Sequence, residues 1–183
     1  LAESGVDTDR AITLLDGMPI SDAEAQNGLG VAYTQAQRYP EAVTAFARVL
    51  ALDPTNGIAL QNLGSIAMRQ ALASSGDDRR KKLIEAETLA RRALDVDPAL
   101  PDAHTTLGVI LSTTGRKADA IESWKRAVAL DATQFNALYN LWLELADAGR
   151  RDEAVIYGRQ FVSTAPPAFF KPDIERIRRY LIP

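Results

Sequence analysis

The most constraining feature of this sequence is an internal period of 34 residues. A Leu-Gly pair at Leu29-Gly30 is followed by a second pair at Leu63-Gly64, 34 residues later. An alanine keeps the same step further along the chain, at Ala86, Ala120 and Ala154. Self-similarity at a fixed period of about 20 to 50 residues is typical of repeat proteins, whose units stack on their neighbours. The sequence therefore predicts an array of similar units.

The period breaks once, and two markers place the break in the same repeat. The steps from Gly64 to Gly108 and from Ala42 to Ala86 are both 44 residues long. The second repeat thus carries ten additional residues, which we assign to about 71–80. This segment includes Ser74-Ser75-Gly76-Asp77-Asp78 and runs into Arg79-Arg80-Lys81-Lys82. A longer helix hairpin with a solvated tip accounts for it; the alternative is a projection that docks a partner, since inserted segments on repeat scaffolds often carry function.

These spacings resemble those of the tetratricopeptide repeat (TPR) family, whose 34-residue unit is a helix–turn–helix. The first copy carries the family pattern best, with Leu29, Gly30, Tyr33, Ala42, Phe46 and Pro54. The second copy has Leu63, Gly64, Ala86, Ala90 and Pro98, and the third has Leu107, Gly108, Ala120 and Trp124. In the fourth copy Trp142 and Gly158 depart from the glycine and aromatic positions. The resemblance implies an all-α fold, a right-handed α-solenoid of antiparallel helix pairs.

Glycines inside predicted helices support this packing on physical grounds. Gly30, Gly64 and Gly108 lie mid-helix, where glycine costs about 1 kcal/mol relative to alanine. A cost that recurs at one phase indicates that the missing side chain lets paired helices approach closely. Aromatic residues in the second helices, Phe46, Trp124 and Phe161, are expected in the core between helices. The single histidine, His104, is also expected to pack rather than to act chemically.

We expect four full repeats within residues 21–168, at about 23–56, 57–100, 101–134 and 135–168. Residues 1–20 read as a partial preceding repeat, and residues 169–183 as a C-terminal capping helix that begins at Lys171-Pro172-Asp173. Ser21-Asp22-Ala23-Glu24 predicts a capping box, and Pro40 a first helical position. Gly115 and Gly149 are expected to end helices. Phe169 and Phe170 are expected to anchor the capping helix.

Composition excludes several classes of function. The net charge is −3, which disfavours binding to nucleic acid through a general positive field. There are no cysteines, and no apolar run approaches the roughly 18 residues of a membrane span. No catalytic, metal-binding or cofactor motif is present, so we expect a non-enzymatic protein without cofactors. Cytoplasmic and periplasmic locations are both compatible with the sequence.

The resemblance implies that the first helices of the repeats line a concave groove that binds a peptide or a partner helix. The candidate groove residues are Asn27, Gln35, Gln61, Asn62, Arg69, Thr106, Tyr139 and Asn140. Asn62 and Asn140 share one phase, and either face the ligand or bond neighbouring turns. The basic clamp with which some family members hold acidic C-terminal tails is absent, because Asn27, Val31, Asp102 and Thr106 stand in its other positions.

The leading functional prediction is a protein–protein interaction scaffold whose partner is a protein or peptide. One alternative is the C-terminal repeat segment of a larger bacterial multidomain protein, an enzyme or a membrane-linked protein, because the sequence starts inside a repeat. Another is self-association through open repeat ends, where an array exposes apolar surface.

Overall fold

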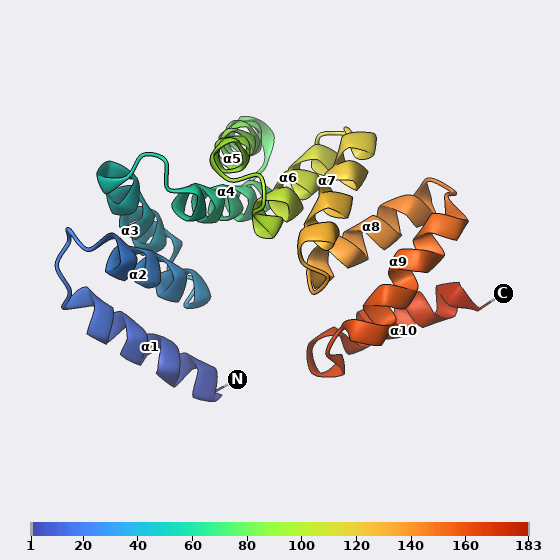
Figure 1. Ribbon diagram of the computed structural model, residues 1–183, viewed down its shortest axis with the longest axis horizontal. Coiled ribbons are helices and arrows are strands. Elements are labelled where there is room, and N and C mark those ends of the chain that lie inside the picture. The colour runs from blue at the N-terminus through green and yellow to red at the C-terminus, as the bar shows by residue number, and fades with distance from the viewer. Residues whose placement is uncertain (1, 183) are drawn as a thin grey trace. The chain divides into compact units, whose positions relative to one another are not determined.

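The computed structural model describes the backbone of residues 2–182 and the side chains of residues 8–182. This part of the chain contains ten α-helices and no strand (Figure 1). The helices are α1 (Ala2–Asp16), α2 (Ala23–Gln35), α3 (Tyr39–Leu52), α4 (Gly57–Leu72), α5 (Gly76–Val96), α6 (Pro101–Thr113), α7 (Lys117–Leu130), α8 (Phe135–Asp147), α9 (Arg151–Thr164) and α10 (Pro167–Leu181). The chain divides into two compact units, an N-terminal unit (Leu1–Pro98) and a C-terminal unit (Ala99–Pro183).

The N-terminal unit is built from two helix hairpins with α1 packed against the first. Helices α2 and α3 pair, α4 and α5 pair, and α3 contacts α4. One apolar cluster includes Phe46, Val49 and Ile66, all nearly inaccessible to solvent. A second, containing Ile12 and Leu29, joins α1 to the first hairpin. Because α2 and α4 each pack on both sides, a single hairpin could not bury its apolar surface alone.

The C-terminal unit repeats this plan. Helices α6 and α7 pair, α8 and α9 pair, and α10 packs on α9. Phe46 in the N-terminal unit and Trp124 and Phe161 here are buried, so the core positions predicted for these aromatics are confirmed. The predicted all-α fold of paired helices is also confirmed, since neither unit has a strand among its described residues.

The recurring glycines face the second helix of their own pair. A Cβ placed on Gly30 would lie 2.5 Å from the Phe46 ring, and one on Gly108 would overlap the indole of Trp124. Gly64 faces the backbone instead, with its added Cβ 3.3 Å from the nitrogen of Ala90. The close approach predicted from the sequence is therefore present in three repeats.

The fourth repeat reverses the two sides of this contact. Trp142 occupies the position of the glycine on α8, and Gly158 occupies the position of the aromatic on α9. A Cβ on Gly158 would lie 3.0 Å from Cδ1 of Trp142 and 3.0 Å from Cγ2 of Ile177 on α10. The indole thus fills the space from the first helix, and the vacated position on the second helix receives α10. The two departures from the family pattern compensate each other.

The ten additional residues lengthen the two helices of the second hairpin. Helix α4 has 16 residues where α2 has 13, and α5 has 21 where α3 has 14. Three and seven extra residues therefore account for all ten, while the connection between the helices stays as short as in the other hairpins. The second hairpin is longer than the first.

Two helix starts differ from the sequence prediction by one position. The N-cap of α2 is Asp22, whose carboxylate accepts a hydrogen bond from the Ala25 amide at 3.0 Å, so the capping box assigned to Ser21 is wrong. Aspartate caps as well as serine, and the competition between adjacent residues is invisible in the motif. Helix α3 begins at Tyr39, which places Pro40 second rather than first. The predicted stops Gly115 and Gly149 are confirmed, with φ of 83° and 71°.

The C-terminal helix begins earlier than predicted and contains a break. Helix α10 starts at Pro167, and Phe170 has non-helical angles (φ −120°, ψ 20°) before the remaining turns. Phe170 packs against Phe135 and Phe161 at ring distances of 5.4 and 5.5 Å. Phe169 is 80% exposed, so the anchoring role predicted for it is wrong. The break turns only one of two adjacent phenylalanines inward.

We predict that Gly108→Ala destabilises the protein by about 1–3 kcal/mol, because the added methyl would overlap the indole of Trp124, which is buried. The measurement is urea unfolding of wild type, Gly108→Ala, Trp124→Leu and the double variant. The cost of Gly108→Ala should shrink in the Trp124→Leu background, since the obstructing ring is gone. Equal costs in both backgrounds would show that Gly108 is not retained for helix approach.

Candidate peptide-binding face

Three pairs of residues on α2 and α4 stand 34 residues apart and share one helical phase. They are Asn27 with Gln61, Val31 with Ser65, and Gln35 with Arg69. Within each helix these positions are four residues apart, so they form a stripe on one side. Helices α2 and α4 contact each other within the N-terminal unit. We call these six residues, together with Ile58 and Asn62, the first-helix face of the N-terminal unit.

The first-helix face combines polar groups with exposed apolar side chains. Asn27 is half-buried, and its side-chain oxygen is inaccessible to solvent without a hydrogen-bond partner among the described residues. An orphaned buried acceptor is costly and therefore uncommon in folded proteins. Gln35 and Arg69 are exposed, while Val31 and Ile58 are 40% and 53% exposed. The face thus offers amide hydrogen bonding beside apolar contact surface.

A second helical phase, occupied by Gly28, Asn62 and Asn140 in three of the repeats, lies next to this stripe. A Cβ on Gly28 would be 3.1 Å from Cδ1 of Leu15, so α1 occupies this phase in the first repeat and leaves no room for an asparagine. Asn62 and Asn140, at the same phase in later repeats, are half-buried. Within residues 8–182 their side chains form no hydrogen bond to a neighbouring turn.

The remaining predicted groove residues lie in the C-terminal unit. Thr106 is half-buried on α6, and Asn140 on α8. Tyr139 is already engaged, because its hydroxyl accepts a hydrogen bond from Arg176 of α10 at 2.7 Å. Its ring also packs against Trp142 and Phe161 at 5.6 and 5.9 Å. Tyr139 thus belongs to the aromatic contact between α8 and α10. Nothing in the sequence spacing links it to Arg176.

The C-terminal unit also holds a buried carboxylate that the sequence analysis missed. Glu144 on α8 is 8% exposed and accepts a hydrogen bond from the Ser112 hydroxyl on α6 at 2.8 Å. The ammonium of Lys117 on α7 forms an ion pair with it. The hydrogen bond between the Lys117 ammonium and the Glu144 carboxylate raises the pKa of Lys117. Glu144 therefore links α6, α7 and α8, and both of its polar partners come from within the C-terminal unit. Its polar type at a buried helix position was the only sequence signal.

Aspartates between repeats form a second recurring polar feature. Oδ1 of Asp131 accepts hydrogen bonds from the Thr133 amide at 2.8 Å and from its hydroxyl at 2.7 Å. Asp53 is bonded to Thr55 in the same way. The threonine hydroxyls, followed by the amides, lower the pKa of both carboxyls. Gln134 then links Asp131 to Asp102 and Thr105 of α6. These contacts set the approach of one first helix to the next.

A cavity of about 160 Å³ lies elsewhere in the N-terminal unit. Its walls come from α1, α2 and α3 and include Asp16, Tyr33 and Arg48. Arg48 donates to the side-chain oxygen of Gln26, which is buried. The cavity does not contain the predicted groove residues. Neither a candidate metal cluster nor a helix able to cross a membrane occurs in the described part of the chain. His104 is half-buried on α6.

Two family models of the tetratricopeptide repeat match this arrangement, one over residues 23–56 and the other over residues 82–137. The chain is a tetratricopeptide repeat protein. No curated protein sequence matches this TPR chain. The matched residues include the helix pairs α2–α3 and α6–α7 described above.

Solved structures of TPR proteins are similar over most of the chain. TTC0263, a thermophilic TPR protein of Thermus thermophilus, has a TM-score of 0.78 at 21% identity, covering 98% of this chain and 96% of that one. MamA has a TM-score of 0.62 at 21% identity, with 94% and 90% covered. YrrB, described as a TPR protein with an unusual peptide-binding site, has a TM-score of 0.61 at 20% identity, with 95% and 86% covered. At these identities the likeness establishes the fold.

We predict that Asp131→Asn is less stable than wild type at neutral pH and that the difference closes as the pH falls. The lowered pKa of Asp131 means that its contribution is present above about pH 4 and is lost as the carboxyl protonates in the folded state. Urea midpoints measured from neutral to acidic pH test this. Asp95→Asn, an exposed carboxylate on α5, is the control. A gap that stays constant with pH would contradict the prediction.

Proposed function

We propose that this TPR protein is a non-catalytic interaction scaffold that binds a peptide or partner helix along its first helices, with the first-helix face of the N-terminal unit as the principal site. The observation that carries the proposal is the repeated stripe on α2 and α4, which combines the exposed polar side chains of Gln35 and Arg69 with the exposed aliphatic side chains of Val31 and Ile58. An extended peptide presents amides and carbonyls that asparagine and glutamine side chains can pair. Its apolar side chains can cover the two exposed aliphatic residues.

The C-terminal unit contributes less to this proposal. Thr106 and Asn140 remain candidates there, but Tyr139 is committed to Arg176. The peptide-binding site in the description of YrrB is consistent with such a role for this fold, although that protein shares only 20% identity with this chain. The missing basic clamp argues against recognition of a C-terminal carboxylate on this face, because Arg69 is the only cation on it.

The experiment compares partner capture by the wild-type chain and by Asn62→Ala/Arg69→Ala, with Arg92→Ala/Arg126→Ala as a control at exposed positions elsewhere. We expect the first variant to lose about tenfold in affinity for the captured partner, or about 1.4 kcal/mol, since a few residues dominate most interfaces. The control should bind as wild type does. Unchanged capture by Asn62→Ala/Arg69→Ala would contradict the proposed face, provided that both variants keep the wild-type helical content.

Self-association is a second candidate, favoured by apolar side chains near α1. Leu14, Met18 and Ile20 are 66%, 45% and 63% exposed and lie together in the chain. Clustered exposed apolar residues often mark contact surfaces. A molar mass by light scattering that rises with concentration, and that returns to the monomer value in Leu14→Gln/Ile20→Gln, would support this candidate. A monomer at all concentrations would eliminate it. A role as one segment of a larger multidomain protein remains compatible with both candidates.

A further inference from the structure

The second hairpin extends beyond the length of the first by residues 70–72 of α4 and 76–82 of α5, which we call the extension. Ala71 is fully buried between α4 and α5, so the added turns pack against each other. Across the two helices, the ammonium of Lys82 donates to the side-chain oxygen of Gln70 at 2.9 Å. The Ser74 hydroxyl donates to the backbone oxygen of Gln70 at 2.8 Å and closes the turn. The inserted residues therefore form an ordered projection of the hairpin.

This extension concentrates unpaired positive charge. Arg79, Arg80, Lys81 and Lys82 follow one another on α5, and none of them forms an ion pair with a described residue. Asp77 and Asp78 precede Lys81 and Lys82 by four residues, a spacing that permits pairing. Elsewhere cations such as Arg38, Arg91 and Arg150 pair with carboxylates. Because the chain as a whole has a charge of −3, this basic cluster is a local feature.

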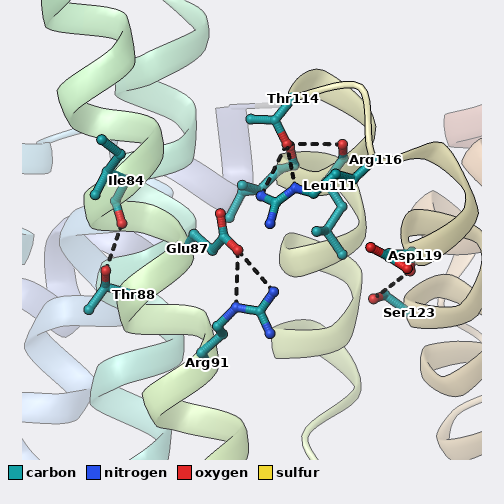
Figure 2. A network of polar contacts seen from close by, with 10 residues as sticks. Ile84, Glu87, Thr88, Arg91, Leu111, Thr114, Arg116, Asp119 and Ser123 are labelled. Atoms are coloured by element: carbon teal, nitrogen blue, oxygen red, sulfur yellow. Dashed lines mark hydrogen bonds and ion pairs between the residues drawn. The ribbon is translucent and has the colours of Figure 1, made fainter.

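The four basic residues stand in the second turn of α5, beyond the first turn, where the helix dipole acts most strongly. Exposed apolar side chains accompany the basic residues: Leu72, on the added part of α4, is 54% exposed, and Ile84, at the repeat position of Pro40, is 61% exposed. Arg80, Lys81 and Ile84 are spaced to lie on one side of α5, and all three are exposed. Figure 2 shows Ile84 on α5, one turn before Thr88, whose hydroxyl donates to the Ile84 carbonyl.

We propose that the side of the extended hairpin formed by Arg80, Lys81 and Ile84 binds an acidic segment of a partner protein that carries an apolar residue among its carboxylates. Charge complementarity supplies the attraction, and Ile84 gives the contact an apolar centre. This site is separate from the first-helix face and does not depend on the function proposed for it. The extension adds a second interface to the scaffold.

A protein segment fits this surface better than a membrane or a nucleic acid does. Asp77 and Asp78 precede the basic residues at the tip, so an anionic bilayer approached end-on would meet carboxylates first. The segment 71–90 contains no aromatic side chain on which a base could stack. Arg80 and Lys81 lie along the side of the helix, with exposed Asp77 and Glu85 one turn before and after Lys81, so a partner segment that places its carboxylates opposite Arg80 and Lys81 fits this side.

The test uses the full chain and a fluorescein-labelled, C-terminally amidated peptide rich in Glu and Asp with a single central leucine, followed by fluorescence anisotropy. We expect binding that weakens with added salt and falls by about tenfold in Arg80→Gln/Lys81→Gln. Ile84→Gln should weaken binding to a lesser extent. Arg92→Gln/Arg126→Gln removes the same charge elsewhere and should bind as wild type does. A peptide with Gln and Asn in place of the acidic residues should not bind.

Several outcomes would overturn the proposal. They are no binding of the acidic peptide by wild type, an equal loss in the Arg92→Gln/Arg126→Gln control, and full binding by Arg80→Gln/Lys81→Gln. Binding to anionic phospholipid vesicles without binding to the peptide would assign the cluster to membranes instead. Asn62→Ala/Arg69→Ala should retain peptide binding; loss there and not in the hairpin variant would place the acidic ligand on the first-helix face. Circular dichroism melts establish that each variant is folded.

Discussion

Close approach of paired helices is the constraint on which both units depend. Where α2 meets α3, the aromatic ring of Phe46 occupies the space that a side chain on Gly30 would need. Where α4 meets α5, Gly64 and Ala90 are both small, so the backbones of the two helices approach each other closely. Each hairpin is too small to bury an apolar core alone, so stability comes from helices packed at short distance and from stacking on the next hairpin.

The fourth repeat shows that this constraint acts on the pair and not on each position. Trp142 and Gly158 exchange the large and the small residue between α8 and α9, and the volume between the helices is filled from the opposite side. The exchange has a consequence for neighbouring structure. Gly158 admits Ile177, and Tyr180 meets the indole edge-on at 5.6 Å. Helix α10 therefore packs onto a surface that the departure from the family pattern created, and Tyr139 becomes part of that contact.

The two polar surfaces of the N-terminal unit differ in chemistry. The first-helix face is nearly neutral and pairs amides with exposed aliphatic side chains, which suits a peptide backbone. The extended hairpin carries a run of cations on the added turns of α5, next to Ile84 in the repeating part of that helix. In the C-terminal unit, several polar groups instead bond to one another. Glu144 bonds to Ser112 and Lys117, and Gln134 links Asp131 to α6. Both proposed interfaces therefore rest mainly on the first unit.

The sequence by itself determined the helical repeat, its 34-residue step, the glycine and aromatic core positions and the shared phase of Asn62 and Asn140, because periodic spacing is a local property of a helix. Tertiary structure alone decided which polar side chains bond to another helix of the protein. The compensation between Trp142 and Gly158, the lengthening of α4 and α5 by the additional residues and the bond between Tyr139 and Arg176 depend on contacts between different helices. Phe169 and Phe170 are adjacent and have similar propensities. The non-helical backbone at Phe170 decides that Phe169 is exposed and that Phe170 packs inward. Periodicity assigns a residue to a side of its helix, whereas packing determines what meets it there.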